Sequence, residues 1–312
     1  MKKIIFMGTP DFAVPVLDAI VAADYEVVLV VTQPDRPVGR KRVLTAPPVK
    51  DAAIKHDIPV FQPEKLKDEV DTLKQYEADL IVTAAYGQLL PKEVLDYPAF
   101  GCINVHASLL PKLRGGAPIH YAILQGEKET GITIMYMAEK LDAGDIISQA
   151  TIPILEEDHV GTLHDKLSEV GAKLLMDTLP EIFDGTNKRV VQNEDEATFA
   201  SNITREQEKV DFTGSYETVY NHIRGLHPWP VAYAKLEGQN IKIWWAEKDD
   251  TVYENSQPGE IVAVTEDAFI VACGDKHAVK ITDVQVAGKR RMTVNQLLKG
   301  NSDQFQVGQL LA

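Results

Sequence analysis

The sequence predicts an α/β protein: a Rossmann-like domain with a mostly parallel sheet, followed by a small β-barrel of the oligonucleotide-binding type. The chain has 312 residues, and a single hydrophobic core stops growing near ~250–300 residues, so we expect two domains. Strands alternate with helices over the first two thirds, which is typical of a parallel sheet with helices on both faces. Short, closely spaced strands follow in the last third, as in a small barrel.

The first domain begins with a short apolar strand, and Pro10 and Asp11 then mark the start of a helix. Residues 27–32 are an unbroken run of β-branched residues and leucine, as expected of a parallel strand buried on both faces. The predicted strands are 3–8, 27–32, 60–61, 80–84, 101–106, 130–137 and 143–149. The predicted helices are 11–22, 48–56, 68–76, 118–124 and 163–183, with a basic, proline-rich loop over 33–48.

The alternating pattern ends near residue 184, where a polar stretch without apolar periodicity begins. We interpret residues 190–207 as a linker between a domain over 1–189 and a domain over 208–312. In the second domain a short helix is predicted at 216–224. Strands separated by glycine-containing turns are predicted at 232–236, 239–246, 259–264, 268–272 and 277–286.

The composition is that of a globular protein, with 45% hydrophobic and 25% charged residues. No apolar run approaches the ~20 residues of a membrane span, and the apolar run at the N-terminus is too short for a signal peptide, so we expect a cytoplasmic protein. The two cysteines, Cys102 and Cys273, suggest neither a disulfide framework nor a zinc site, and no metal is expected. Cys102 could be a catalytic thiol, but a small buried core residue is the favoured interpretation.

The formal net charge of −14 argues against nucleic-acid binding by bulk electrostatics. Positive charge is nevertheless clustered in two islands, at 36–42 and 289–291. An acidic protein with two basic islands can hold a polyanion at chosen places. Two solvated loops are an equally good interpretation from the residues alone.

Three polar residues form a candidate site for acyl transfer: Asn104, His106 and Asp142. Asn104 and His106 are two residues apart on one predicted strand, so their side chains share a face. Asn104 can donate hydrogen bonds to a carbonyl oxygen that becomes an oxyanion, and His106 can act as an acid, a base or a charged stabiliser. Asp142 can hold His106 or, through water, take a proton from an amine.

The first turn, by contrast, argues against a nicotinamide dehydrogenase. It lies where a dinucleotide-binding fold has its phosphate-binding glycines, but the sequence there is Gly8-Thr9-Pro10-Asp11. Pro10 lacks an N–H group, and Asp11 brings negative charge next to the place of a pyrophosphate. We therefore set that function aside.

The Asn104-x-His106 pair, the segment 108–119 (SLLPKLRGGAPI) and Asp142 resemble the signature of the folate-dependent formyltransferase family. The opening segment 6–15, the segment 32–40 and the sequence His-Pro-Trp-Pro at 227–230 resemble the branch of that family that formylates methionyl-tRNA. The likeness covers essentially the whole chain. It implies transfer of a formyl group from 10-formyltetrahydrofolate to the α-amine of methionyl initiator tRNA.

The resemblance also implies roles for single residues. Asn104, His106 and Asp142 match the catalytic trio: the first two would bind the tetrahedral oxygen, while Asp142 would be either the base or an orienter of His106. The residues that match the folate-contacting loop are Ser108, Leu109, Leu110 and Pro111, and Tyr86 and Gly87 are further candidates to line the folate cleft.

The basic islands match tRNA contacts in the same way, and we expect a monomer. The loop residues Arg36, Arg40, Lys41 and Arg42 match a basic insertion that enters the acceptor arm. The second-domain candidates are Lys242, Lys289, Arg290 and Arg291. Arginine suits this role because its guanidinium binds phosphate and stacks on bases. We interpret the tryptophans Trp229, Trp244 and Trp245 as packing residues rather than base platforms.

Two other functions remain open. A folate-dependent transferase or hydrolase acting on a small amine or a nucleotide sugar would share the trio but would require neither the second domain nor the basic loop. A tRNA-binding module that only retains the fold is the other alternative, and loss of folate binding would be its sign.

Overall fold

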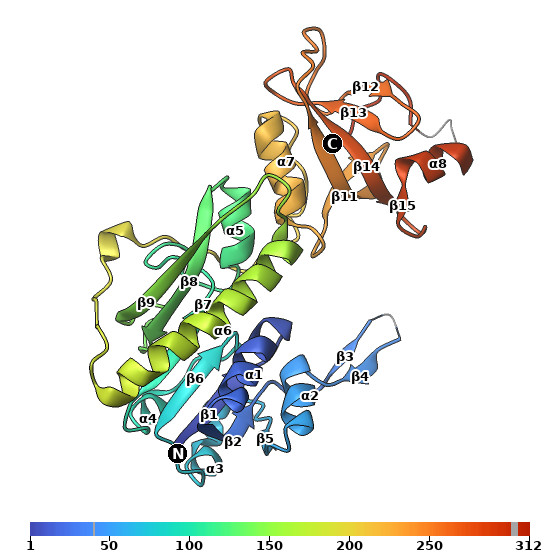
Figure 1. Cartoon of the computed structure of the whole chain (residues 1–312). Coiled ribbons are helices and arrows are strands. Elements are labelled where there is room, and N and C mark those ends of the chain that lie inside the picture. Colours follow the sequence, from blue (N-terminus) through green and yellow to red (C-terminus); the bar gives the residue numbers. More distant parts are fainter. Residues whose placement is uncertain (40, 301–304) are drawn as a thin grey trace. The chain divides into compact units, whose positions relative to one another are not determined.

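The structure is a computed structural model that describes residues 1–39, 41–300 and 305–312. The chain forms two compact units (Figure 1). Unit 1 comprises Met1–Pro118, Glu129–Pro153 and His164–Ala200. Unit 2 comprises Ile119–Lys128, Ile154–Leu163 and Ser201–Ala312. The chain thus passes between the units several times, which a simple division into consecutive ranges does not describe.

Unit 1 is built on a seven-stranded sheet with the order β5-β2-β1-β6-β7-β8-β9. The strands from β5 to β7 pair in parallel, and β8 and β9 add antiparallel pairs at one edge. The strand bounds are β1 (Lys2–Gly8), β2 (Tyr25–Val31), β5 (Val60–Phe61), β6 (Leu80–Ala84), β7 (Cys102–His106), β8 (Glu129–Tyr136) and β9 (Ile146–Pro153). The predicted Rossmann-like, mostly parallel sheet is confirmed.

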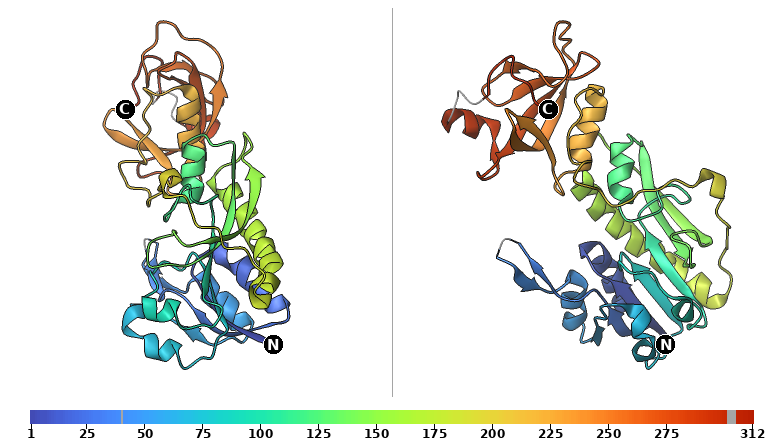
Figure 2. Two further views of the ribbon diagram at one scale, coloured as in Figure 1. Left: turned by 90° about the vertical axis from the view of Figure 1, so that its left-hand side faces the viewer. Right: turned by 180° about the vertical axis from the view of Figure 1, so that it is seen from behind.

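Helices cover both faces of this sheet. α1 (Val14–Ala22) and α6 (Val160–Asp184) lie across one face (Figures 1 and 2), and Ser168 of α6 donates to the carbonyl of Phe12 at 2.7 Å. On the other face, alternate strand residues pack in one cluster with Leu73 and Val94. The remaining elements of unit 1 are η1 (Asp11–Ala13), α2 (Pro48–Lys55), η2 (Leu66–Asp68), α3 (Val70–Leu73), α4 (Lys92–Leu95) and η3 (Glu194–Glu196). The helix α5 (Pro118–Leu124) belongs to unit 2 except for its first residue. The single helix predicted at 68–76 is instead η2 followed by the short α3.

The residues before and after η3 run along the edge of unit 1 and form hydrogen bonds with it. Val190 pairs with Ile146 of β9, and Phe199 forms a bridge with Arg114. Backbone hydrogen bonds also join Ala117 N–H to Ala200. This part of the stretch that we interpreted as a linker therefore belongs to unit 1.

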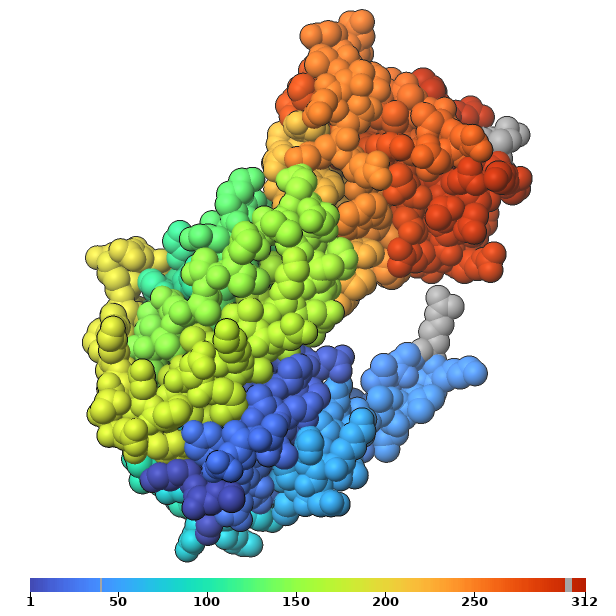
Figure 3. Space-filling view, viewed as in Figure 1, coloured from blue at the N-terminus to red at the C-terminus, as the bar shows by residue number. Residues whose placement is uncertain are grey.

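The segment predicted as a basic loop contains a two-stranded antiparallel hairpin, so that prediction was incomplete. Its strands are β3 (Arg36–Val38) and β4 (Val43–Thr45). Gly39 (φ 72°) and Arg42 (φ 49°) have positive φ angles that let the chain reverse. Both strands are exposed, and the hairpin projects from the surface of unit 1 (Figure 3). Arg40 lies outside the described residues.

Unit 2 contains an antiparallel sheet with the order β10-β11-β14-β13-β12, and β15 pairs with β14. Residues 309–312 close this sheet, because their backbone bonds to Ile261 and Gly259 beside β12 and to Lys235 of β10. The elements are α7 (Tyr216–Gly225), β10 (Ala232–Leu236), β11 (Gln239–Asp249), β12 (Ile261–Val264), β13 (Phe269–Ala272), β14 (Ala278–Val286), β15 (Met292–Thr293) and α8 (Val294–Gly300). The rings of Phe269 and Phe305 stack at 4.7 Å in its core. Among the described residues, no helix is long and apolar enough to cross a membrane.

Candidate active site

Asn104 lies on β7 beside Thr83 of β6, near the carboxyl ends of two parallel strands. The Thr83 hydroxyl donates to Asn104 Oδ1 at 2.7 Å, and its oxygen also lies 3.1 Å from the carbonyl oxygen of Ile103. Oδ1 accepts from the hydroxyl in this arrangement, so the Nδ2 group is directed away from Thr83. Among the described residues Nδ2 has no hydrogen-bond acceptor, and its two N–H groups are available to a ligand carbonyl.

His106 ends β7 and is 6% exposed. Its Nε2 atom lies 3.0 Å from the carbonyl oxygen of Leu113. A carbonyl can only accept, so Nε2 carries a proton and donates it. The other nitrogen, Nδ1, lies 3.7 Å from Asp142 Oδ2. Nδ1 is therefore the ring nitrogen that remains available for chemistry.

Asp142 lies in the turn between β8 and β9, in a left-handed conformation (φ 49°). Its side chain is 12% exposed, and Oδ2 accepts a hydrogen bond from the backbone N–H of Gly115 at 2.8 Å. Gly144 allows this turn to close, because a Cβ atom added there would lie 1.8 Å from the carbonyl oxygen of Tyr136. The turn and its glycine thus fix the carboxylate beside the imidazole.

Three consecutive residues, Leu113 to Gly115, hold the two ionisable side chains in place. Leu113 accepts from His106, and Gly115 donates to Asp142. Gly115 has φ 118°, and a Cβ atom there would lie 2.6 Å from the carbonyl oxygen of Ala200, so only glycine fits. The segment is fixed by hydrogen bonds from Leu113 N–H to Thr198 Oγ1 (2.9 Å) and from Ala200 N–H to the Arg114 carbonyl (2.7 Å).

Arg114, between these two residues, is fully buried, and its partners come from the segment before and within η3. Nε and Nη2 donate to Gln192 Oε1 at 3.0 and 2.8 Å, and Nη2 also donates to Glu194 Oε1 at 2.9 Å. Hydrogen bonds from Arg114 and Lys140 lower the pKa of Glu194 to about 2. Sequence reasoning missed Arg114, Gln192 and Thr83 as site residues, because partners so far apart in the chain give no local signal.

The predicted folate loop begins two residues after His106, and Ser108 and Leu110 are buried. Ser108 is 1% exposed and donates to the Lys112 carbonyl at 2.7 Å. The backbone of Leu110 is bonded on both sides, by Thr133 Oγ1 and Gln149 Nε2. Leu109 and Pro111 are partly exposed. Hydrogen bonds within the protein therefore hold the Ser108 side chain and the Leu110 backbone in place.

Tyr86 and Gly87, the other predicted folate residues, follow β6. The Tyr86 side chain packs in the core cluster of unit 1, where burial raises the pKa of its hydroxyl. Its backbone carbonyl accepts from Thr9 Oγ1 (2.9 Å) and Gln33 Nε2 (3.2 Å). Gly87 is exposed with φ 93°. Tyr86 thus fixes the loop from inside, and Gly87 lies at the surface.

Both cysteines are buried core residues. Burial raises the pKa of each thiol, Cys102 and Cys273, to about 12. Cys102 packs in the core cluster of unit 1 and lies 3.5 Å from the Val94 carbonyl. A thiol that stays protonated is a poor nucleophile, so the core interpretation of Cys102 is the one that its surroundings favour.

The predicted tRNA-binding cations differ in their exposure and in whether they already form an ion pair. Arg36 pairs with Glu64 (2.7 Å), and Arg291 forms two hydrogen bonds with Asp283 (3.0 and 2.7 Å). Lys242 is partly buried on β11. The exposed side chains without an ion pair to any described residue are Lys41, Arg42, Lys289 and Arg290.

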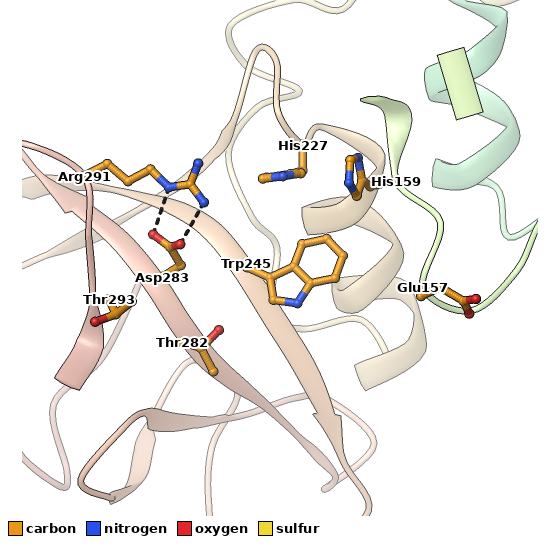
Figure 4. A pocket seen from close by; sticks show the side chains of 8 residues that line it. All are labelled: Glu157, His159, His227, Trp245, Thr282, Asp283, Arg291 and Thr293. Carbon is orange, nitrogen blue, oxygen red and sulfur yellow. Dashed lines mark hydrogen bonds and ion pairs between the residues drawn. The ribbon is translucent and has the colours of Figure 1, made fainter. Parts of the chain in front are cut away.

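Unit 2 has a pocket of about 460 Å³ (Figure 4). The Trp245 ring contacts the rings of His159 and Tyr220, with centroids 5.7 and 6.3 Å away. In Figure 4 Trp245 lies between His159 and the ion pair of Arg291 with Asp283. Burial, followed by the neighbouring His159, lowers the pKa of His227 to about 4. Arg291 also lies 4.4 Å from the ring centre of Trp244, whereas Trp229 is 42% exposed. Within the described part of the chain, no group of His, Cys, Asp and Glu side chains could hold a metal ion.

Comparison with known proteins assigns both units. The formyl transferase family matches residues 1–179, and the formyl transferase C-terminal domain matches residues 202–302. The methionyl-tRNA formyltransferase of Halalkalibacterium halodurans is 59% identical over 99% of this chain and 98% of its own length. That of Lysinibacillus sphaericus is 57% identical over 99% of both chains.

Solved structures with low sequence identity share the fold. The N-formyltransferase from Helicobacter canadensis in complex with folinic acid and dTDP-3-aminofucose has a TM-score of 0.71 and 18% identity, covering 90% of this chain and 99% of its own. HypX from Aquifex aeolicus in complex with tetrahydrofolic acid has a TM-score of 0.67 and 18% identity, covering 96% of this chain and 47% of its own. Taken with the full-length relatives, these matches mean that the chain belongs to the methionyl-tRNA formyltransferases within the formyl transferase family.

Proposed function

We propose that this chain transfers the formyl group of 10-formyltetrahydrofolate to the α-amine of methionyl initiator tRNA, giving N-formylmethionyl-tRNA for translation initiation in the cytoplasm. The observation that carries the proposal is the pairing of His106 Nδ1 with the Asp142 carboxylate at 3.7 Å, beside the free amide of Asn104. Identity of 59% to an enzyme named for this reaction supports the same substrate pair.

The donor set of the site fits a formyl carbonyl and an amine. When bound, 10-formyltetrahydrofolate supplies a formyl carbon that an amine nitrogen can attack. Asn104 Nδ2 donates to the carbonyl oxygen as negative charge develops on it, and this kind of donor contributes about 10²–10³-fold to the rate. His106 contributes from Nδ1, the ring nitrogen that lies 3.7 Å from the Asp142 carboxylate.

Asp142 handles the proton of the amine. The amine nitrogen forms a bond to the formyl carbon, the bond from that carbon to the folate nitrogen breaks, and one proton moves from the amine to the departing nitrogen. The Asp142 carboxylate, fixed by the Gly115 N–H, is the group placed to take this proton, directly or through water. Asp142 then both orients His106 and accepts the proton, because the same oxygen, Oδ2, faces Gly115 N–H and His106 Nδ1.

We assign the substrate-binding residues as follows. The loop Ser108–Pro111 and the exposed Gly87 contact the folate, and residues 1–189 carry the chemistry. The protein acts as a monomer, and its cationic side chains contact the tRNA. The strongest candidates for these contacts are Lys41 and Arg42 in the hairpin and Lys289 and Arg290 in the turn after β14. The weaker candidates, which are paired, partly buried or outside the described residues, are Arg36, Arg40, Lys242 and Arg291.

An amino sugar is the second candidate acceptor, because a formyltransferase solved with dTDP-3-aminofucose matches 90% of this chain. The presence of a second unit therefore does not by itself distinguish an enzyme that acts on tRNA from one that acts on an amino sugar. Sequence identity does favour one of them, with 59% to the tRNA enzyme against 18% to the sugar enzyme.

The test is a formyl-transfer assay with 10-formyltetrahydrofolate and three acceptors: methionyl initiator tRNA, free methionine and a nucleotide-linked amino sugar. We expect formylmethionine to form only on tRNA. Folate turnover without tRNA, or transfer to the sugar, would overturn the proposal in favour of a small-molecule enzyme. Formation of tetrahydrofolate and formate in the absence of any acceptor would indicate a hydrolase.

A further inference from the structure

The buried side chain of Gln192 joins the two loops that form the candidate active site. Its Oε1 accepts from Arg114 Nε and Nη2, and its Nε2 donates to the carbonyl oxygens of Asp142 and Gly144, each at 2.8 Å. A guanidinium only donates and a carbonyl only accepts, so one orientation of the amide satisfies all four contacts. A carboxylate could replace Oε1 but not Nε2.

The contacts lie on the turn that carries the catalytic carboxylate. Asp142 has a left-handed backbone (φ 49°), and Gly144 is buried. Among the described residues, Gln192 is the hydrogen-bond donor to both carbonyls, and a buried carbonyl that loses its donor destabilises the conformation that buries it. The turn would therefore rearrange without Gln192, and Asp142 Oδ2 would leave its place beside His106 Nδ1.

Arg114 fixes Gln192 in turn. Its side chain is fully buried, and the fork of Nε and Nη2 matches a single oxygen of Gln192. Its neighbours Leu113 and Gly115 bind His106 and Asp142, so the same short segment sets the imidazole, the carboxylate and, through Gln192, the backbone under the carboxylate.

We propose that Gln192, held by Arg114, is a positioning residue that keeps the Asp142 turn in the geometry needed for formyl transfer. The inference rests on the function proposed above. Gln192 itself contacts no reacting atom and acts through Asp142. It should therefore affect the turnover number and leave substrate affinity largely unchanged, because a displacement of about 1 Å at a catalytic group can cost about 10²-fold.

The first step of the test compares Gln192→Ala with Gln192→Glu. Gln192→Glu keeps the side-chain volume and the Arg114 contacts but places an oxygen against two carbonyl oxygens. It therefore still tests the proposal if Gln192→Ala does not fold. We expect kcat to fall about 10- to 100-fold in both, with the KM values for tRNA and folate within about twofold of wild type. Asn193→Ala, at the exposed neighbouring residue, is the matched control and should keep kcat within about twofold.

The second step is a double-mutant cycle with Asp142→Ala. If Gln192 acts through Asp142, adding Gln192→Ala to Asp142→Ala changes kcat by less than about twofold. An equal loss in both backgrounds, or an unchanged kcat in Gln192→Ala and Gln192→Glu, would overturn the inference while leaving the proposed function intact. A wild-type chain without tRNA formylation would instead overturn the proposed function and this inference with it. A fully active Asp142→Ala variant would leave the function in place but overturn the role assigned to Asp142, and with it this inference.

Discussion

At the scale of single residues, the site depends on which atoms are already engaged. His106 donates from Nε2 to Leu113, and Asn104 Oδ1 accepts from Thr83, so the remaining side-chain nitrogen of each is available for the proposed reaction. The residue types and spacing of Asn104, His106 and Asp142 could be predicted from the sequence, because amide, imidazole and carboxylate are the groups that acyl transfer requires. Arg114 and Gln192 could not, since an arginine and a glutamine far apart in the chain reveal no function until the fold joins them.

Cys102 provides a residue-scale prediction. Cys102→Ala should keep kcat within about twofold of wild type, because the thiol is buried and the reaction uses other groups. The free energy of unfolding should fall by about 1–2 kcal/mol through lost packing. Steady-state formylation and urea denaturation measure the two quantities, with Cys273→Ala in unit 2 as the matched control. A hundredfold loss of kcat with normal stability would instead assign Cys102 to catalysis.

His227 should make stability depend on pH. Its pKa in the folded chain is about 4, below the ordinary value near 6.5, so the unfolded chain binds a proton that the folded chain does not. Wild type should therefore lose stability as the pH falls from 6.5 to 4, and His227→Gln should lose less. The difference should be on the order of 1 kcal/mol, reduced by solvent at this half-buried site.

Urea denaturation at pH 7, 6, 5 and 4 measures this effect, with His56→Gln at a partly exposed histidine as the control. Parallel stability curves for wild type and His227→Gln would show that His227 titrates normally in the folded chain.

At the scale of elements, the turn between β8 and β9 is the least tolerant part of the site. Gly144→Ala would bring a methyl group against the Tyr136 carbonyl and move Asp142. We expect a loss of at least about tenfold in kcat and about 1–3 kcal/mol in the free energy of unfolding. Gly300→Ala, in the last turn of α8, meets no described atom within 4 Å and should change neither quantity appreciably. A fully active Gly144→Ala variant would mean that the exact closure of this turn is unimportant.

Strand-helix alternation predicted most elements of unit 1, because buried parallel strands have a strong local pattern. The hairpin of β3 and β4 was not predicted, since exposed strands of three residues have too few apolar positions to show alternation. The closure of the unit 2 sheet by residues 309–312 was also missed, because it depends on contacts with strands much earlier in the chain.

At the scale of the whole molecule, the proposed function requires an acidic chain to bind a polyanion, and unpaired cations are the groups best suited to do so. The net charge is −14, and Arg36 and Arg291 are already paired with carboxylates. Arg42→Leu should therefore lower kcat/KM for tRNA by about tenfold at 0.1 M salt and reduce the steepness of its decline with salt. The KM for folate should not change.

Salt titrations of kcat/KM measure this prediction, and Lys67→Leu, which removes an exposed cation outside both islands, is the matched control. Equal salt dependence of kcat/KM in wild type and Arg42→Leu would mean that the hairpin is a solvated surface loop that does not bind tRNA.

The most direct test of the central claim is the single-turnover rate of formyl transfer to methionyl-tRNA by Asp142→Asn, with substrates saturating. Asparagine keeps the size of the side chain and can still accept from Gly115 N–H, but it cannot take a proton. The control is Asp145→Asn in the same turn, whose carboxylate pairs with Arg189. We predict a rate about 10²–10⁴-fold below wild type for Asp142→Asn and a nearly normal rate for Asp145→Asn. A wild-type rate in Asp142→Asn would contradict the account.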